Sequence, residues 1–243
     1  MKRLVVLQHV GVEGPGLFAK IAKKKGFKVD IIRLDLEENL PKLIKGDILL
    51  ILGGPMGVKD IKSNKYPWLG KEIKLIKSTL KRDIGIIGVC LGAQLLSYSA
   101  GGDVELLKRG SPPRPFPEIG WSEIFTEKIY SCEEISCMLK KPMKVLHWHA
   151  DRILLPRNSK LLASSNYCKE QLFKIGEKAY GLQFHIEYEV NMVYKWIEIY
   201  EEFIISALGK DGPEKLKNNL VNNEKETLNS RIDFINKLME LTI

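Results

Sequence analysis

The sequence feature that most constrains the fold is an apolar run that ends in a glycine-flanked cysteine. Residues 84–89 are isoleucine, valine or glycine, Cys90 follows, and glycines stand two residues before and two residues after it. Residues 93–100 then contain neither glycine nor proline, which favours a helix. The pattern predicts a strand over 84–89, a tight turn at Cys90 and a helix from residue 91 to about residue 99.

The spacing around Cys90 is that of a nucleophile elbow, G-x-Nuc-x-G, in which the nucleophile occupies a strained turn packed closely against its neighbours. At the start of a helix, backbone N–H dipoles also favour a thiolate. A structural interpretation stays open at this point, because cysteine is often a small buried hydrophobe and glycine often ends a strand.

Short apolar strands alternate with helices in the first part of the chain. We expect strands at 3–9, 28–34, 47–52 and 84–89, and helices at 17–25, 67–80 and 91–99. This alternation predicts an α/β fold with a mostly parallel central sheet flanked by helices. Active sites in such sheets gather at the carboxyl ends of the strands, where Cys90 and the pair Gly53 and Gly54 both fall.

The pattern changes after residue 110. Residues 111–117 contain four prolines and are not expected to form regular structure. Short strands predicted at 118–125, 144–147, 160–163, 171–175 and 179–184 suit a small antiparallel or mixed edge. An apolar helix is predicted over 190–208 and a charged helix over 213–243. We therefore expect a main domain over residues 1–208 and a C-terminal helical appendage over 209–243.

Composition excludes several functional classes. The net charge is +8, but the lysines are scattered along helical stretches and no nucleic-acid-binding fingerprint accompanies them, so we expect no nucleic-acid partner. No window approaches the roughly 18 consecutive apolar residues of a membrane span, and the N-terminal apolar run is too short for a signal peptide. Four irregularly spaced cysteines argue against a disulfide framework, so a cytoplasmic location is expected.

A cysteine nucleophile needs a base and a third group that orients the base. The chain has four histidines, of which His185 is the best candidate, because a strand leads into it and Glu187 follows two residues later. The sequence G-V-C-L-G-A-Q (residues 88–94) together with Q-F-H-I-E (residues 183–187) resembles the class I glutamine amidotransferases. The similarity spans roughly residues 4–196 and is greatest to the amidotransferase domain of GMP synthases and its stand-alone relatives.

The resemblance implies a flavodoxin-like architecture and a role for each site residue. Cys90 attacks the side-chain amide of glutamine, His185 relays protons and Glu187 orients His185. The resemblance assigns the oxyanion hole to the backbone N–H groups of Gly54 and Leu91, and substrate binding to Gln94, Gly53, Trp148 and His149. The glutamyl thioester on Cys90 is then hydrolysed and ammonia leaves. No metal or other cofactor is expected.

The sequence departs from the family pattern in two ways. Ile186 stands between the histidine and the glutamate, where the family usually has proline. No nucleotide-binding motif or synthase domain is present, so an acceptor for the ammonia is expected on a separate synthase subunit. A related type of enzyme hydrolyses γ-glutamyl bonds in small peptides, and this alternative stays open.

Two rival interpretations come from other classes. His147 and His149 alternate on a strand-like run and point to one face, so with His185 and Glu187 they suit a metal-dependent hydrolase. That interpretation leaves the cysteine elbow unexplained. A non-catalytic regulatory module on the same fold is the other rival, although the whole triad is present. His9 is interpreted as a packing residue at a strand end, and Cys168 as a buried thiol.

Overall fold

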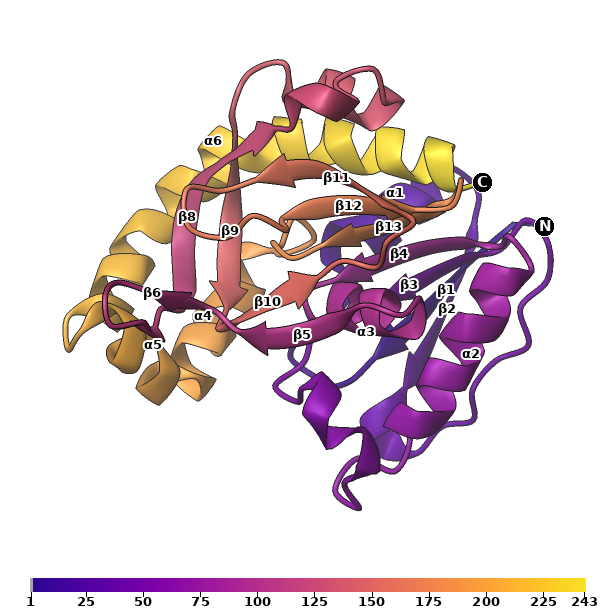
Figure 1. Ribbon diagram of the computed structural model, residues 1–243, viewed down its shortest axis with the longest axis horizontal. Helices are drawn as coiled ribbons and strands as arrows, with labels where there is room; N and C mark the ends of the chain where they lie inside the picture. The colour runs from indigo at the N-terminus through magenta and orange to yellow at the C-terminus, as the bar shows by residue number, and fades with distance from the viewer. Residues whose placement is uncertain (1) are drawn as a thin grey trace.

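A computed structural model describes residues 2–243, and a mixed sheet of nine strands lies at its centre (Figure 1). Five strands are parallel: β2 (Lys28–Arg33), β1 (Arg3–Gln8), β3 (Ile48–Ile51), β4 (Gly85–Val89) and β13 (Ala179–Leu182). The other four continue the sheet in antiparallel pairs: β12 (Leu172–Ile175), β11 (Ser159–Ser164), β8 (Glu118–Thr126) and β9 (Met143–His149). The predicted parallel core with an antiparallel edge is confirmed.

Helices cover both faces of the parallel strands, because the inner strands β1, β3 and β4 are apolar and buried on both sides. On β1, Leu4 and Val6 pack into one core with α1 (Gly16–Lys24) and α6 (Gly212–Thr242). Val5 and Leu7 pack on the other face with α2 (Leu69–Lys81) and α3 (Leu91–Ser99). A third apolar cluster joins α4 (Val190–Ile199) and α5 (Glu201–Leu208) to β9.

The single helix predicted over 190–208 is wrong. The chain forms α4 and α5, which are separated at Tyr200, where φ is −106° and ψ is 28°. The Tyr200 hydroxyl donates a 2.8 Å hydrogen bond to Oε1 of Glu13, a residue far away in the sequence. The break thus accompanies a tertiary contact that no local pattern reveals.

Several short elements were not expected. An antiparallel pair joins β5 (Asp103–Leu106) to β10 (Asp151–Leu154). The proline-rich stretch, predicted to be irregular, contributes β7 (Arg114–Pro115), which pairs with β6 (Lys108–Arg109). Short 3₁₀ helices occur as η1 (Leu34–Leu36), η2 (Val58–Lys62), η3 (Lys128–Tyr130) and η4 (Glu134–Leu139).

The C-terminal helix α6 runs across the back of the molecule, and its last residues pack against Gly85 at the start of β4 (Figure 1). Phe234, Ile235 and Leu238 of α6 are fully buried in the core that α1 and the sheet form. Its charged side chains alternate with these, as expected for an amphipathic helix. The predicted domain boundary at residue 208 stays a prediction.

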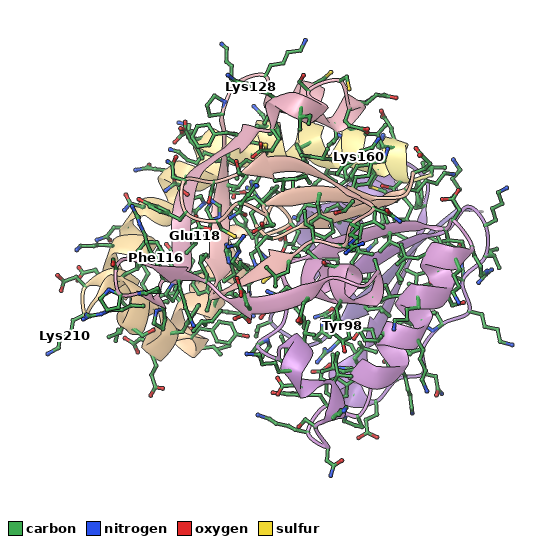
Figure 2. All side chains as sticks on the ribbon, in the orientation of Figure 1. Tyr98, Phe116, Glu118, Lys128, Lys160 and Lys210 are labelled. Carbon is green, nitrogen blue, oxygen red and sulfur yellow. The ribbon has the colours of Figure 1, made fainter. Side chains whose placement is uncertain are left out.

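Charged side chains such as Lys128 and Lys210 point away from the molecule, whereas Glu118 lies inside it (Figure 2). Among the described residues, 2–243, there is no helix both long and apolar enough to cross a membrane.

Candidate active site

Cys90 occupies a sharp turn between β4 and α3. Its φ of 52° and ψ of −108° lie outside the regions that residues with side chains usually adopt. Its N–H donates a 2.7 Å hydrogen bond to the carbonyl of Leu182 at the end of β13. The turn therefore presents the thiol at the carboxyl end of the sheet, where ligands of α/β proteins bind.

The two glycines of the elbow allow the chain to pack closely. A Cβ on Gly88 would lie 2.5 Å from the carbonyl oxygen of Gly92, and a Cβ on Gly92 would lie 2.1 Å from that of Ile51. Neither glycine has a positive φ. Both positions thus require glycine because of space, not because of backbone conformation.

His185 and Glu187 follow β13, which lies beside β4 and brings them close to the elbow. Nδ1 of His185 donates a hydrogen bond of 2.6 Å to Oε1 of Glu187, and both side chains are buried. Nε2 of His185 has no hydrogen-bond partner among the described residues. His185 and Cys90 both lie next to Gly53. A Cβ built on Gly53 would lie 3.3 Å from Cε1 of His185 and 3.6 Å from Cβ of Cys90.

The electrostatic surroundings of His185 favour its protonated form. Burial lowers the pKa of His185, but the carboxylate of Glu187 and the side chain of Cys90 raise it more, so the pKa lies well above its usual value. An imidazolium at this position stabilises negative charge that develops on the neighbouring sulfur. The arrangement suits a thiol nucleophile paired with a histidine base.

Ile186, which replaces the proline usual in the resembling family, supplies a backbone hydrogen bond. Its N–H donates to Oε2 of Glu187 at 2.9 Å, and proline has no N–H to donate. The backbone carbonyl of Glu187 accepts a second bond, of 2.8 Å, from the N–H of Leu17. Isoleucine in place of proline at position 186 therefore adds a hydrogen bond that holds the Glu187 carboxylate in place.

The glycine turn after β3 is held by a buried histidine. Nδ1 of His9 donates to the carbonyl of Gly53 at 3.0 Å, and its Nε2 lies 3.1 Å from both carboxylate oxygens of Glu72. A Cβ on Gly54 would lie 3.0 Å from Cβ of His9 and 3.2 Å from Cδ2 of Leu91. His9, interpreted from the sequence as a packing residue, thus positions the turn that bears one of the predicted oxyanion donors.

A cavity of about 300 Å³ opens beside Cys90. Its walls come from the elbow, the glycine turn, β9 and the helices after β13. Most of the predicted site residues line it: Cys90, Leu91, Gln94, Gly54, Trp148, His149 and His185. Gly53 and Glu187 lie beneath it, in contact with the residues of the lining.

Comparison with known proteins settles the family. Residues 17–193 match the glutamine amidotransferase class-I family. The chain belongs to that family. The resemblance inferred from the two motifs is confirmed, and so is the fold that it implied.

The chain is similar to several known proteins. A glutamine amidotransferase-like protein of Salmonella typhimurium is 28% identical over 86% of this chain and 85% of its own length. A GMP synthase subunit from Methanobrevibacter smithii is 31% identical over 65% of this chain and 73% of its own length. Gamma-glutamyl peptidase 4 of Arabidopsis thaliana is 28% identical over 54% of this chain and 51% of its own length. A glutamine amidotransferase from Thermotoga maritima has a crystal structure that superposes with a TM-score of 0.82, at 29% identity over 98% of both chains.

Sequence reasoning missed Glu13, which lines the cavity beside Cys90. Burial raises the pKa of Glu13, while the charge of His185 and the hydrogen bond from Tyr200 lower it, and the net pKa is raised. Glu13 stands in the loop after β1, at the same carboxyl edge as the elbow, which is the signal that points to it. The aromatic wall of Trp196, Tyr200 and Phe203 has no comparable signal in the sequence.

His147 and His149 project from the same face of β9, as their alternation predicts. The structure brings them together with Glu118 of β8 instead of Glu187. Burial lowers the pKa of His147 to about 4, and the carboxylate of Glu118 offsets this only in part. His147 is therefore a neutral, buried imidazole.

Proposed function

We propose that this amidotransferase hydrolyses the side-chain amide of glutamine through a glutamyl thioester on Cys90. The observation that carries the proposal is the 2.6 Å bond between His185 and Glu187, next to a cysteine on a strained elbow. The proton of the Cys90 thiol resides on Nε2 of His185 before the reaction, so the Cys90 thiolate attacks the amide carbon beside an imidazolium. Glu187 accepts the Nδ1–H bond throughout and so keeps Nε2 directed at the reacting atoms.

The tetrahedral intermediate collapses with loss of ammonia. Backbone N–H groups of Leu91 and Gly54 stabilise the oxyanion, and each such donor is worth about 3 kcal/mol. His185 gives its proton to the leaving nitrogen, which departs as ammonia. It then takes a proton from a water molecule that attacks the thioester, so glutamate leaves and the thiol is restored. Gln94 and Gly53, together with the backbone at Trp148 and His149, hold the amino-acid end of the substrate.

The ammonia passes to an acceptor on another polypeptide in this proposal. The relative from Methanobrevibacter smithii is one subunit of a GMP synthase, which supports an acceptor on a separate subunit. Its four cysteines are free thiols, which suits the reducing cytoplasm.

A second candidate is hydrolysis of γ-glutamyl bonds in small peptides. The aromatic wall of Trp196, Tyr200 and Phe203, together with Trp148, favours it, because an apolar surface beside the nucleophile suits a leaving group larger than ammonia. The relative from Arabidopsis thaliana is a γ-glutamyl peptidase.

One assay separates the two candidates. The purified chain is given glutamine and a panel of γ-glutamyl dipeptides, and the release of ammonia or of the second amino acid is followed. The first proposal expects the highest kcat/KM with glutamine, and the Cys90→Ala variant serves as the control. A preference of tenfold or more for a dipeptide would replace the first candidate by the second. Absence of activity on every substrate, with and without a synthase partner, would contradict both.

A further inference from the structure

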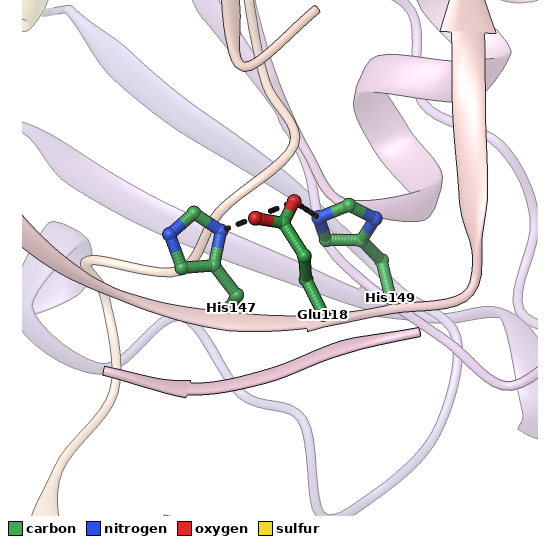
Figure 3. A group of neighbouring side chains, drawn as sticks. All are labelled: Glu118, His147 and His149. Atoms are coloured by element: carbon green, nitrogen blue, oxygen red, sulfur yellow. Dashed lines mark ion pairs between the residues drawn. The ribbon is translucent and has the colours of Figure 1, made fainter. Parts of the chain in front are cut away.

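Three polar side chains converge inside the molecule behind the wall of the active-site cavity (Figure 3). Glu118 of β8 stands opposite His149 of β9 in the antiparallel register, and His147 lies two residues earlier on the same face. Gly120 is opposite His147 and leaves that side of the strand pair without a side chain. All three converging side chains are buried.

The ligand atoms lie close together. Nε2 of His149 is 3.1 Å from Oε2 of Glu118, and Nδ1 of His147 is 3.9 Å from the same oxygen. One nitrogen from each ring and one carboxylate oxygen all lie within 4.8 Å of one another. A tetrahedral ion with bonds of about 2.0–2.1 Å places its ligand atoms roughly 3.3–3.5 Å apart. Small side-chain rotations therefore suffice to close the three atoms around one ion.

The surrounding hydrogen bonds direct these atoms inward. Nδ1 of His149 donates to the carbonyl of Asp151 at 2.8 Å, so Nε2 is the ring nitrogen that faces Glu118. Oε1 of Glu118 accepts a 2.7 Å bond from the hydroxyl of Ser165. Histidines and carboxylates that bind metals are held by outer partners of this kind. The amide of Gln171 closes the remaining side, 2.8 Å from Oε2 of Glu118.

A network of hydrogen bonds alone does not explain why His147 is buried. Among residues 2–243, neither of its ring nitrogens makes a hydrogen bond of good geometry, and the backbone of Ser122 is the one polar group outside the cluster that acts on its pKa through a hydrogen bond. A buried polar group without a partner is destabilising, and a metal bond would remove that cost. Two imidazoles and one carboxylate are also a ligand set that Zn²⁺ takes in proteins.

We propose that Glu118, His147 and His149 bind one divalent first-row transition metal ion, for which Zn²⁺ is the best match. This departs from the expectation of no metal, and it differs from the hydrolase rival because His185 and Glu187 take no part. Glu118 and His147 also line a second cavity of about 310 Å³, so an ion reaches them without crossing the catalytic cavity.

The ion has a positioning role. It ties β8 to β9 on either side of Trp148, whose carbonyl lies 3.7 Å from Sγ of Cys90. Binding therefore stabilises the wall of the catalytic cavity without contacting the substrate. The proposal does not depend on the substrate of the enzyme.

Metal titration of the full chain tests the site. Cys132 and Cys137 are exposed thiols, and thiols bind Zn²⁺ themselves. The protein used in the titration therefore carries Cys132→Ser and Cys137→Ser. After chelator treatment and dialysis, Zn²⁺ is titrated by calorimetry and Co²⁺ by absorption spectroscopy. We expect one equivalent per chain, a higher melting temperature with Zn²⁺, and a tetrahedral Co²⁺ spectrum without a thiolate charge-transfer band.

Variants identify the ligands. His147→Asn and Glu118→Gln should each weaken Zn²⁺ binding by about 100-fold or more. Glu123→Gln removes an exposed carboxylate of the same strand and should leave binding unchanged. If one of these two variants fails to fold, Zn²⁺ binding by the other variant and the Co²⁺ spectrum of the parent protein still test the proposal. A parent protein that binds no stoichiometric metal, a thiolate band, or equal binding in Glu118→Gln and the parent would overturn the proposal.

Discussion

At the scale of the residue, Glu187 sets the protonation of His185. A carboxylate beside an imidazolium stabilises the proton, so Glu187→Gln should lower the pKa of His185 from its raised value. The alkaline limb of the profile of kcat/KM against pH reports loss of that proton, and it should move to lower pH. We expect kcat to fall about 10²–10⁴-fold, as when a triad acid is neutralised.

A pH–rate profile of glutamine hydrolysis measures both effects. Glu177→Gln, which alters an exposed carboxylate, is the matched control and should keep the parent profile. An alkaline limb that stays in place in Glu187→Gln would mean that the carboxylate does not act on the imidazole.

The backbone N–H of Ile186 supports the same carboxylate. Ile186→Ala and Ile186→Pro both remove the buried side chain, but only proline also removes the bond to Oε2 of Glu187. A hydrogen bond to a charged group contributes about 1.5–3 kcal/mol to the free energy of unfolding. Proline offsets roughly 0.4–1 kcal/mol of that loss, because it restricts the unfolded chain. The proline variant should therefore be about 1–2 kcal/mol less stable than the alanine variant. Urea unfolding of the pair gives this difference, and equal stabilities would show that the bond contributes nothing.

At the scale of the element, the elbow depends on Gly92. Gly92→Ala places a Cβ 2.1 Å from the carbonyl oxygen of Ile51, so the strand and the helix must move apart. We expect a loss of about 3 kcal/mol or more in the free energy of unfolding, together with loss of activity.

Gly70 is the matched control for Gly92. Each is the second residue of its helix, and the nearest atom to a Cβ on Gly70 lies at 3.8 Å. Gly70→Ala should stabilise the chain by up to about 1 kcal/mol, because alanine favours helix over glycine. Thermal unfolding that shows similar effects for the two substitutions would contradict the packing argument.

The sequence predicts elements well where a local pattern determines them. The strand, elbow and helix over residues 84–99 lie within one residue of their expected bounds, because glycine spacing and apolar runs encode them locally. The break at Tyr200 and the meeting of Glu118 with His147 depend on tertiary contacts and strand register. Such contacts leave no periodic trace in the sequence.

At the scale of the whole molecule, α6 connects the C-terminus to the active site. Arg231, fully buried on α6, donates to the carbonyls of Ile186 at 3.2 Å and Tyr188 at 2.8 Å, on either side of Glu187. Its guanidinium also lies over the ring of Tyr188. The C-terminal segment thus supports the loop that carries the predicted triad acid.

Truncation after residue 208 tests this connection. It removes Phe234, Ile235 and Leu238 from the core, and each buried side chain of that size contributes about 1.5–3 kcal/mol. We expect the truncated chain to be unfolded or aggregated, as judged by circular dichroism and size-exclusion chromatography. Lys217→Ala, at an exposed position of α6, should behave like the parent. A folded, active fragment 1–208 would show that the segment is dispensable.

The central claim is that Cys90 is the activated thiol, and covalent labelling tests it most directly. Burial raises the pKa of Cys168 to about 12, so that thiol should react slowly. Cys132 and Cys137 are free, exposed thiols, and no motif in the sequence places a base beside either of them. The chain is treated with a glutamine analogue that carries a reactive chloro ketone, and the modified residue is mapped by peptide mass spectrometry. The account predicts one label per chain, on Cys90, with loss of ammonia release in step with labelling. Label spread over all four cysteines, or ammonia release that survives Cys90→Ala, would contradict it.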